Sequence, residues 1–243
     1  MKEISPFLDL RLGDCMDLMR EYPDGHFDLA IVDPPYGIGV SQKSNPGGQT
    51  SSAKYKAPTL KEYKISSWDD QSPSAEYFLE LQRVSNHQII WGANHFMDKV
   101  MRGSPSWIVW DKKNGETKFA DAELAFTSHN KPVRIWAGLW NGFQRCEQVD
   151  RIHPTQKPRK LYEWLLANYA KPGDRILDTH LGSGSIAIAC HYRQHHLTAC
   201  EIDPDYFAAA MDRIERETRQ LTLFSPSITP PLHHSITPPP PLL

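Results

Sequence analysis

The sequence is poor in cysteine, lacks long apolar runs and carries almost no net charge. Its four cysteines among 243 residues are dispersed without paired spacing, which argues against a disulfide framework or a zinc site and fits a reducing cytoplasm. No apolar run approaches the length of a membrane span and no signal peptide opens the chain, so we expect a cytoplasmic protein with no membrane partner and no metal. The net charge of −2 gives no overall signature of a nucleic-acid-binding protein.

The composition is that of an ordinary globular protein, with 40% hydrophobic and 23% charged residues. Its length suits one domain with a full core, which we place at 1–224. From residue 225 the chain becomes rich in proline and repeats Ser-Ile-Thr-Pro-Pro at 227–231 and 235–239, so we predict a disordered tail over 225–243. The histidine pairs at 195–196 and 233–234 are expected at the surface.

The most informative stretch is an apolar run at 27–32 that stops at two prolines. The run predicts a buried strand, and Pro34 and Pro35 must end it because they lack backbone N–H groups and have fixed φ angles. Ligands of open α/β sheets bind at the carboxyl ends of strands. There the Asp33 carboxylate and the Pro34 carbonyl could each accept an N–H from a planar amine, and Tyr36 offers a face for stacking a base. A Pro-Pro turn without chemistry is the plain alternative.

A second candidate site lies where a strand, a glycine-rich turn and a helix follow one another at 175–192. Gly182 and Gly184 would let the backbone approach a ligand closely, and the helix offers free N–H groups at its amino end. Glu201 follows the next strand, 23 residues after Asp178, close to the spacing at which such folds hold ribose hydroxyls. The third glycine of the full dinucleotide fingerprint is missing.

Strand and helix patterns alternate along most of the chain. This alternation predicts an α/β fold with a mostly parallel central sheet. Strands are expected at 8–14, 27–32, 88–91, 107–110, 123–126, 133–136, 175–178 and 196–200, and helices at 15–21, 74–84, 161–170, 186–192 and 206–219.

Basic residues gather in two segments. The first, at 38–66, is predicted to be a long mobile loop that follows Asp33 and could flank a polyanion. The second lies at 137–160. A solvated loop explains lysines of this kind equally well. The DNA-binding candidates are Lys43, Lys54, Lys56, Lys112, Lys113 and Arg145.

Taken together, these stretches resemble the permuted β type of S-adenosylmethionine-dependent DNA amino-methyltransferases. In that family an Asp-Pro-Pro-Tyr motif precedes the cofactor-binding motif, as 33–36 precedes 178–185 here. The family usually shows Asp-Pro-Phe before its glycines, whereas this chain has Asp178-Thr179-His180, which keeps a flat ring but changes its polarity. The matches run from about residue 12 to residue 214 and include 13–15, 90–96, 110–112 and 153–158.

The resemblance implies a Rossmann-like methyltransferase fold with helices on both faces of the sheet and a circularly permuted motif order. It implies methyl transfer from S-adenosylmethionine to an exocyclic amine of double-stranded DNA, on a base turned out of the duplex. The segment at 112–152 would be a short target-recognition region. The implied catalytic residues are Asp33, Pro34, Pro35 and Tyr36, and the implied cofactor-binding residues are Asp14, Lys157, Asp178, His180, Gly182, Ser183, Gly184, Ser185 and Glu201.

The resemblance does not decide which base is methylated or what Lys157 contacts. An aspartate at the first motif position goes mostly with adenine N6 in the family and a serine with cytosine N4, so Asp33 favours adenine. Lys157 could equally pair with the cofactor carboxylate, contact a phosphate or be plain surface charge.

Other functions are not excluded by the sequence. Related proline-proline-aromatic motifs serve RNA and protein amide methyltransferases, although the motif order argues against them. An inactive module that binds cofactor or DNA is the further alternative, if His180 weakens the cofactor site. The sequence also leaves open whether the protein forms a homodimer or works with a partner restriction endonuclease.

Overall fold

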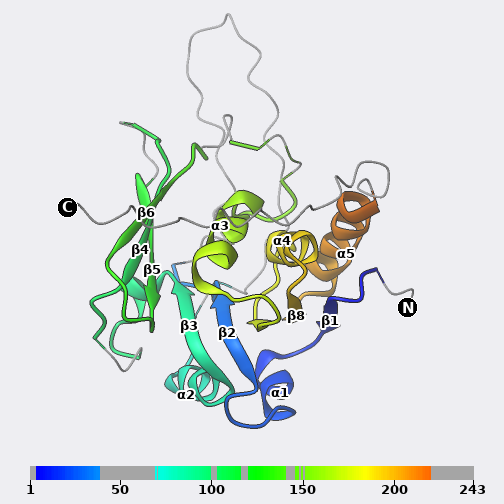
Figure 1. Ribbon diagram of the computed structural model, residues 1–243, viewed down its shortest axis with the longest axis horizontal. Coiled ribbons are helices and arrows are strands. Elements are labelled where there is room, and N and C mark those ends of the chain that lie inside the picture. The colour runs from blue at the N-terminus through cyan, green and yellow to red at the C-terminus, as the bar shows by residue number, and fades with distance from the viewer. Residues whose placement is uncertain are drawn as a thin grey trace, which may run out of the picture.

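The computed structural model describes residues 4–38, 69, 71–99, 103–115, 120–140, 146, 147, 149 and 151–219. These residues form an eight-stranded sheet with the order β1-β8-β7-β2-β3-β5-β4-β6 (Figure 1). Strand β5 runs antiparallel to its neighbours β3 and β4, while the other pairings of this sheet are parallel. The predicted mostly parallel sheet is therefore confirmed.

The strands and helices follow the predicted alternation. The strands are β1 (Leu8–Leu12), β2 (Phe27–Val32), β3 (Ser85–Trp91), β4 (Trp107–Asp111), β5 (Ala122–Thr127), β6 (Arg134–Ala137), β7 (Arg175–Asp178) and β8 (His196–Glu201). The helices are α1 (Cys15–Arg20), α2 (Ala75–Val84), α3 (Arg159–Tyr169), α4 (Ser185–Arg193) and α5 (Pro204–Arg219), and a short 3-10 helix, η2, spans Ala93–His95.

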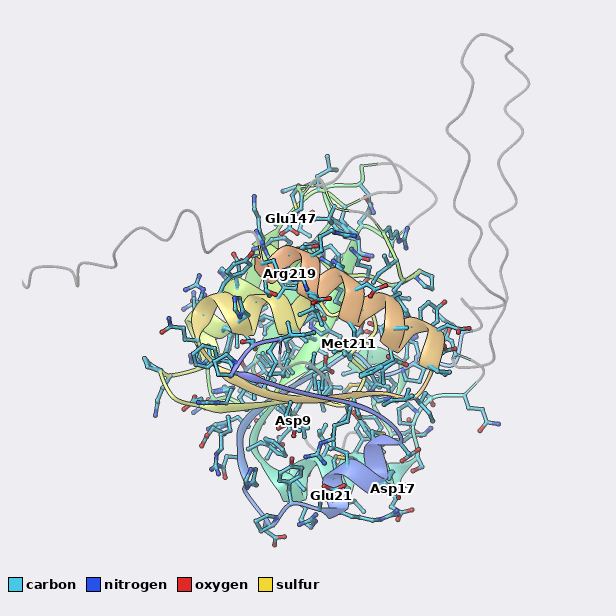
Figure 2. The ribbon with its side chains drawn as sticks, turned by 90° about the vertical axis from the view of Figure 1, so that its right-hand side faces the viewer. Asp9, Asp17, Glu21, Glu147, Met211 and Arg219 are labelled. Carbon is cyan, nitrogen blue, oxygen red and sulfur yellow. The ribbon has the colours of Figure 1, made fainter. Side chains whose placement is uncertain are left out.

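Strand β2 is buried on both faces because its successive residues point into two separate cores. Leu29 and Ile31 join the core formed with α3, α4 and α5, whereas Ala30 and Val32 join the core formed with α1 and α2. Figure 2 shows α4 and α5 on one side of the sheet and α1 on the other. Helices therefore cover both faces of the sheet, as expected.

Carboxylates fix where two of the helices begin. Asp14 accepts a hydrogen bond from the backbone N–H of Met16 at 2.7 Å at the start of α1. The first turn of α3 has no cap from its own preceding residue. Instead the buried carboxylate of Glu147 accepts the backbone N–H groups of Arg159 at 3.1 Å and Lys160 at 2.5 Å.

The order of the strands reverses between β2 and β7. From β2 the chain proceeds to β3 on one side, and from β7 it proceeds to β8 on the other. The two strands pair directly, Leu29 with Ile176 and Ala30 with Leu177. In open α/β sheets ligands bind outside the carboxyl ends of the strands at such a reversal. The segments that follow β2 and β7, which the sequence singled out separately, meet at this point.

A few predictions change or lie outside the described residues. Strand β3 begins at Ser85 rather than at residue 88. The surface assignment is wrong for His195, which is 6% exposed and donates its backbone N–H to the Cys190 carbonyl at 3.0 Å; His196 is exposed. The proposed loop at 38–66 beyond Ile38, the domain boundary at 224, the second histidine pair and the tail at 225–243 lie outside the described part. None of the helices in that part is both long and apolar enough to cross a membrane.

Candidate active site

Five neighbouring parallel strands bring candidate residues to one edge of the sheet. In the order of the sheet, Asp14 follows β1, Glu201 ends β8, Asp178 ends β7, Asp33 follows β2 and Gly92 follows β3. The carboxyl ends of parallel strands meet at the same edge, so residues far apart in the chain become neighbours. The predicted catalytic segment and the predicted cofactor segment thus lie side by side at this edge of the sheet.

The carboxylate of Asp33 has two partners. The hydroxyl of Tyr36 donates to its Oδ1 at 2.8 Å, and the ammonium of Lys157 contacts its Oδ2. The side chain of Asp33 is 15% exposed and that of Lys157 only 2%. Lys157 is therefore not a surface charge, and that interpretation of the sequence is wrong.

Lys157 has a second anionic partner, Glu123 of β5. Its Nζ lies 3.2 Å from Oε2 of Glu123, and the other oxygen of Glu123 contacts the ammonium of Lys112. Asp33, Lys157, Glu123 and Lys112 form a row of alternating charges, which we call the charge array. From the sequence, Glu123 is only part of a predicted strand, because a contact between distant segments leaves no local signal.

The members of the charge array change each other's pKa values. Burial raises the pKa of Asp33, and the charge of Lys157 opposes this rise only in part. Burial also acts on Glu123, but the charges of Lys157 and Lys112 outweigh it and lower the pKa of Glu123 to about 2. Burial acts to lower the pKa of Lys157, and the two carboxylates reverse that effect and raise it. Asp33 is the less well neutralised carboxylate, since it has one ammonium partner where Glu123 has two.

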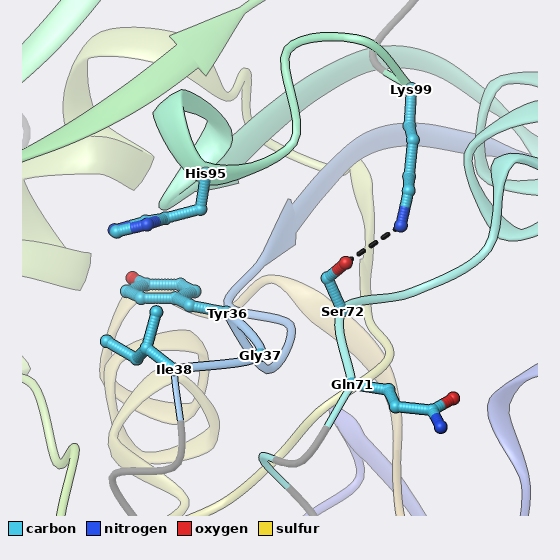
Figure 3. A pocket seen from close by; sticks show the side chains of 7 residues that line it. All are labelled: Tyr36, Gly37, Ile38, Gln71, Ser72, His95 and Lys99. Carbon is cyan, nitrogen blue, oxygen red and sulfur yellow. Dashed lines mark hydrogen bonds between the residues drawn. The ribbon is translucent and has the colours of Figure 1, made fainter.

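The ring of Tyr36 packs tightly between neighbouring segments. Gly92 adopts a φ of +67°, and a Cβ there would lie 2.0 Å from Cε1 of Tyr36, so only glycine fits. The ring of His95 stacks on Tyr36 with centroids 4.9 Å apart and an interplanar angle of 16°, and Figure 3 shows Ile38 near the other face. An open pocket of about 540 Å³ borders this group and is lined by Tyr36, Gly37, Ile38, Gln71, Ser72, His95 and Lys99.

The glycine turn between β7 and α4 has the open backbone that a close-fitting ligand requires. Gly182 and Gly184 have φ values of +52° and +72°. A Cβ at Gly184 would meet Ile214 at 2.8 Å, whereas no atom lies nearer than 3.8 Å to a Cβ at Gly182. Oε2 of Glu201 accepts the backbone N–H of Gly182 at 2.8 Å and so ties the end of β8 to the turn.

The residues at the end of β7 and just after it are largely uncharged, with Asp178 buried and His180 half-buried. Burial raises the pKa of Asp178 to about 8, and its Oδ1 accepts the backbone N–H of His180 at 3.0 Å. Burial lowers the pKa of His180 to about 4, so its imidazole is neutral at pH 7. The imidazole packs edge-on against Tyr77, with ring centroids 5.6 Å apart. His180 thus keeps a flat, uncharged ring at the position where the family has phenylalanine.

The two serines of the turn are bonded within the protein. The hydroxyls of Ser183 and Ser185 lie 3.1 Å apart, and Ser185 donates to the backbone carbonyl of Lys157 at 2.8 Å. Arg213 of α5, 1% exposed, donates to the Ser183 carbonyl and the Ser185 hydroxyl, both at 2.9 Å. These bonds join the glycine turn to the backbone of Lys157, a member of the charge array. Arg213 was missed because a single arginine in an amphipathic helix pattern suggests an exposed position.

The DNA-binding candidates are only partly described. The side chain of Lys112 is 15% exposed and points to Glu123 rather than to solvent. Lys113 is 59% exposed, and its ammonium lies 2.6 Å from Asp111. The other candidates, Lys43, Lys54, Lys56 and Arg145, lie outside the described residues.

Comparison with known proteins shows the family to which the chain belongs. A family model described as DNA methylase matches residues 89–212, about half of the chain. The chain is 25% identical to the type II methyltransferase M.HinfI of Haemophilus influenzae over 276 residues, which cover 95% of this chain and 76% of that protein. Among solved structures, the M1.HpyAVI–SAM complex matches with a TM-score of 0.57 at 16% identity, covering 85% of this chain and 98% of that one. The PvuII DNA methyltransferase, named as cytosine-N4-specific, matches with a TM-score of 0.52 at 12% identity, covering 89% and 94%.

The chain belongs to the N6/N4 family of DNA methylases. It is an S-adenosylmethionine-dependent DNA methyltransferase with the Rossmann-like fold of that family.

Proposed function

We propose that the protein methylates the exocyclic N6 of adenine in double-stranded DNA, with Asp33, Pro34, Pro35 and Tyr36 as its catalytic segment. The position of Asp33 carries the proposal: it lies at the reversal of strand order, beside the glycine turn, on a loop made rigid by two prolines. The aspartate at the first motif position supports adenine over cytosine N4, which is the alternative that the same chemistry allows.

Asp33 and Pro34 have the task of activating a weak nucleophile. The lone pair of an exocyclic amine is delocalised into the base, so the nitrogen attacks poorly. Acceptance of its two N–H groups by the Asp33 carboxylate and the Pro34 carbonyl favours a pyramidal nitrogen whose lone pair is free to attack. The charge of Asp33 also stabilises the positive charge that develops on the nitrogen. We place the target base, turned out of the duplex, against Asp33 and Pro34, next to the open pocket that Tyr36 lines.

The residues at the edge of the sheet fit S-adenosylmethionine, which supplies an electrophilic methyl group. Each oxygen of Glu201 accepts one backbone N–H, from Gly182 and Asp203, and keeps a lone pair for a ribose hydroxyl. Asp14 lies beside it, since the N–H of Gly13 donates to the Glu201 carbonyl at 2.9 Å, and would face the adenine of the cofactor.

The rest of the turn would hold the methionine part of the cofactor. The open side-chain space at Gly182 allows close approach of the ligand to the backbone. Gly184, Ser183 and Ser185 shape the turn, and Asp178 and His180 lead into it, with the backbone N–H of His180 donating to the Asp178 carboxyl. Lys157 acts on Asp33 rather than on the cofactor in this proposal.

Methylated nucleosides identify the substrate directly. Purified protein is incubated with unmethylated genomic DNA and S-adenosylmethionine, and the DNA is digested and analysed by mass spectrometry. An increase in N6-methyladenine supports the proposal. An increase in N4-methylcytosine overturns the choice of base, and no increase in either overturns the proposed function.

Replacement of Asp33 tests the assigned roles. Asp33→Ala removes an acceptor that acts on the target amine, so methyl transfer should fall by about 10²-fold or more. Cofactor affinity, measured by calorimetry, should stay nearly unchanged. Asp17→Ala is the matched control, because Asp17 is an exposed carboxylate of α1 that pairs with Arg20. Lost cofactor binding with normal turnover at high cofactor would show that Asp33 has been given the wrong role.

A further inference from the structure

Two carboxylates share one buried ammonium in the charge array. Nζ of Lys157 contacts Oδ2 of Asp33 and lies 3.2 Å from Oε2 of Glu123. The side chain of Lys157 is 2% exposed and its ammonium lies 5.3 Å from the ring centre of Trp91, so water has little access to either contact. An ammonium has three N–H donors in all. A change in one contact of Lys157 therefore changes the other.

Glu123 is held in place independently of Lys157. Its Oε1 contacts the ammonium of Lys112, and that ammonium lies 4.9 Å from the ring centre of Trp110. Trp110 of β4 is also the direct register partner of Glu123 on β5. The negative charge of Glu123 is thus fixed by two adjacent strands of the sheet.

Asp33 needs an available oxygen for the target amine. Its Oδ1 already accepts the Tyr36 hydroxyl at 2.8 Å, and its Oδ2 faces Lys157. A carboxylate whose ammonium partner pairs with no other anion attracts a further N–H less strongly, because its negative charge is already compensated. Without Lys157, however, burial would favour the protonated form of Asp33, which loses acceptor strength.

We propose that Glu123 is a positioning residue that shares Lys157 with Asp33, so that Oδ2 of Asp33 can accept the amino hydrogen of the target base. This inference rests on the proposed function, because it concerns how Asp33 acts on the amine. Glu123 touches neither the base nor the cofactor in this mechanism and acts through Lys157.

Charge removal at Glu123 should slow the chemical step and leave binding intact. In Glu123→Gln, the ammonium of Lys157 pairs with the Asp33 carboxylate and no longer with a second anion. The single-turnover rate of methyl transfer at saturating DNA and cofactor should therefore fall at least tenfold. The dissociation constants for DNA and cofactor should stay within twofold of wild type. Glu123→Asp, which keeps the charge, should recover part of the rate. Glu163→Gln, which removes a carboxylate that pairs with Arg159 on α3, is the control for loss of an ion pair elsewhere.

The pH profile separates this role from a structural one. The titratable groups around Asp33 are Lys157 from the segment before α3, Glu123 from β5 and Tyr36 from its own loop, together with Asp178 at the end of β7 and Tyr162 of α3. Since Glu123 raises the pKa of Asp33, its replacement by glutamine should move the acid limb of the single-turnover rate to lower pH. A merely destabilised protein would lose activity at higher pH instead.

The outcomes distinguish the two proposals. An active wild-type protein with an unchanged rate in Glu123→Gln, or with an acid limb that moves to higher pH, overturns the role of Glu123 alone. A wild-type protein that methylates no DNA base overturns the proposed function and this inference with it. Slower transfer with intact binding and an acid limb at lower pH supports the role.

Discussion

Replacement of Gly92 by alanine tests whether the position of Tyr36 matters for catalysis. A Cβ at residue 92 would lie 2.0 Å from Cε1 of the Tyr36 ring, and ordinary contact begins at 3.4 Å. The ring must therefore move by more than 1 Å, which would break the 2.8 Å hydrogen bond from its hydroxyl to Asp33. Displacements of about 1 Å in an active site cost on the order of 10²-fold in rate. We expect a loss of that size in single-turnover methyl transfer.

The same substitution also strains the backbone, and this effect needs its own control. A residue with a Cβ in the left-handed region costs about 1–2 kcal/mol. For a domain of this size, that corresponds to a decrease of roughly 2–8 °C in melting temperature. Gly173→Ala isolates this cost, because Gly173 has a φ of +89° with no atom within 4 Å of its Cβ position. Gly103→Ala has the same open space and no strained φ, so it should change nothing.

The comparison of rates is decisive. Gly173→Ala should lose only the backbone part of the stability that Gly92→Ala loses in thermal unfolding, because the clash with Tyr36 adds to the loss at Gly92. Only Gly92→Ala should lose methyl transfer at a temperature where both remain folded. Equal transfer rates in the two variants would refute the reasoning that the packing of the Tyr36 ring against Gly92 holds Asp33 in position.

Further predictions concern other parts of the protein. Lys157→Met removes the charge that opposes the effect of burial on the pKa of Asp33, so the acid limb of the transfer rate should move to higher pH; an unmoved limb would contradict the pairing. The folded-state pKa of about 8 for Asp178 exceeds its unfolded value, so wild-type stability should fall as the pH rises between about 4 and 8, and Asp178→Asn should flatten this fall in melting experiments. Glu147→Ala removes an acceptor at the start of α3 and should cost about 0.5–2 kcal/mol in urea unfolding, against no change if the first turn needs no cap. Burial raises the pKa of all four cysteines, so treatment with a thiol-alkylating reagent at pH 7 should leave methyl transfer intact.

The regular elements could be predicted because each has a local signal. The run at 27–32 is apolar and ends at two prolines, and its burial on both faces explains why it does not alternate. Helix α2 begins where Ser74 caps it, with the backbone N–H of Tyr77 donating to its hydroxyl at 3.3 Å. The direction of β5 had no such signal, since a short strand between turns can pair either way.

The contacts that complete the candidate site could not be predicted. Whether Lys157 faces solvent, cofactor or Asp33 depends on how the segment before α3 folds back over the sheet, which spacing does not reveal. The same holds for Gly92: one glycine after a strand does not show which ring will lie against it. His195 was placed at the surface for its polarity, although its neighbour His196 is the exposed member of the pair.

The pairing of β1 with β8 also bears on how the protein folds during synthesis. In the described sheet β8 is the neighbour of β1, and their register joins Leu12 to Glu201 across most of the chain. Contacts of such large sequence separation form late, because the intervening chain must first be ordered. A nascent chain in which β8 has not yet left the ribosome contains Asp14 without Glu201, and both edges of β1 are then unpaired, since β8 is the neighbour of β1 in the described sheet. The cofactor end of the site is therefore assembled last, and a polypeptide cut short before β8 would be without it.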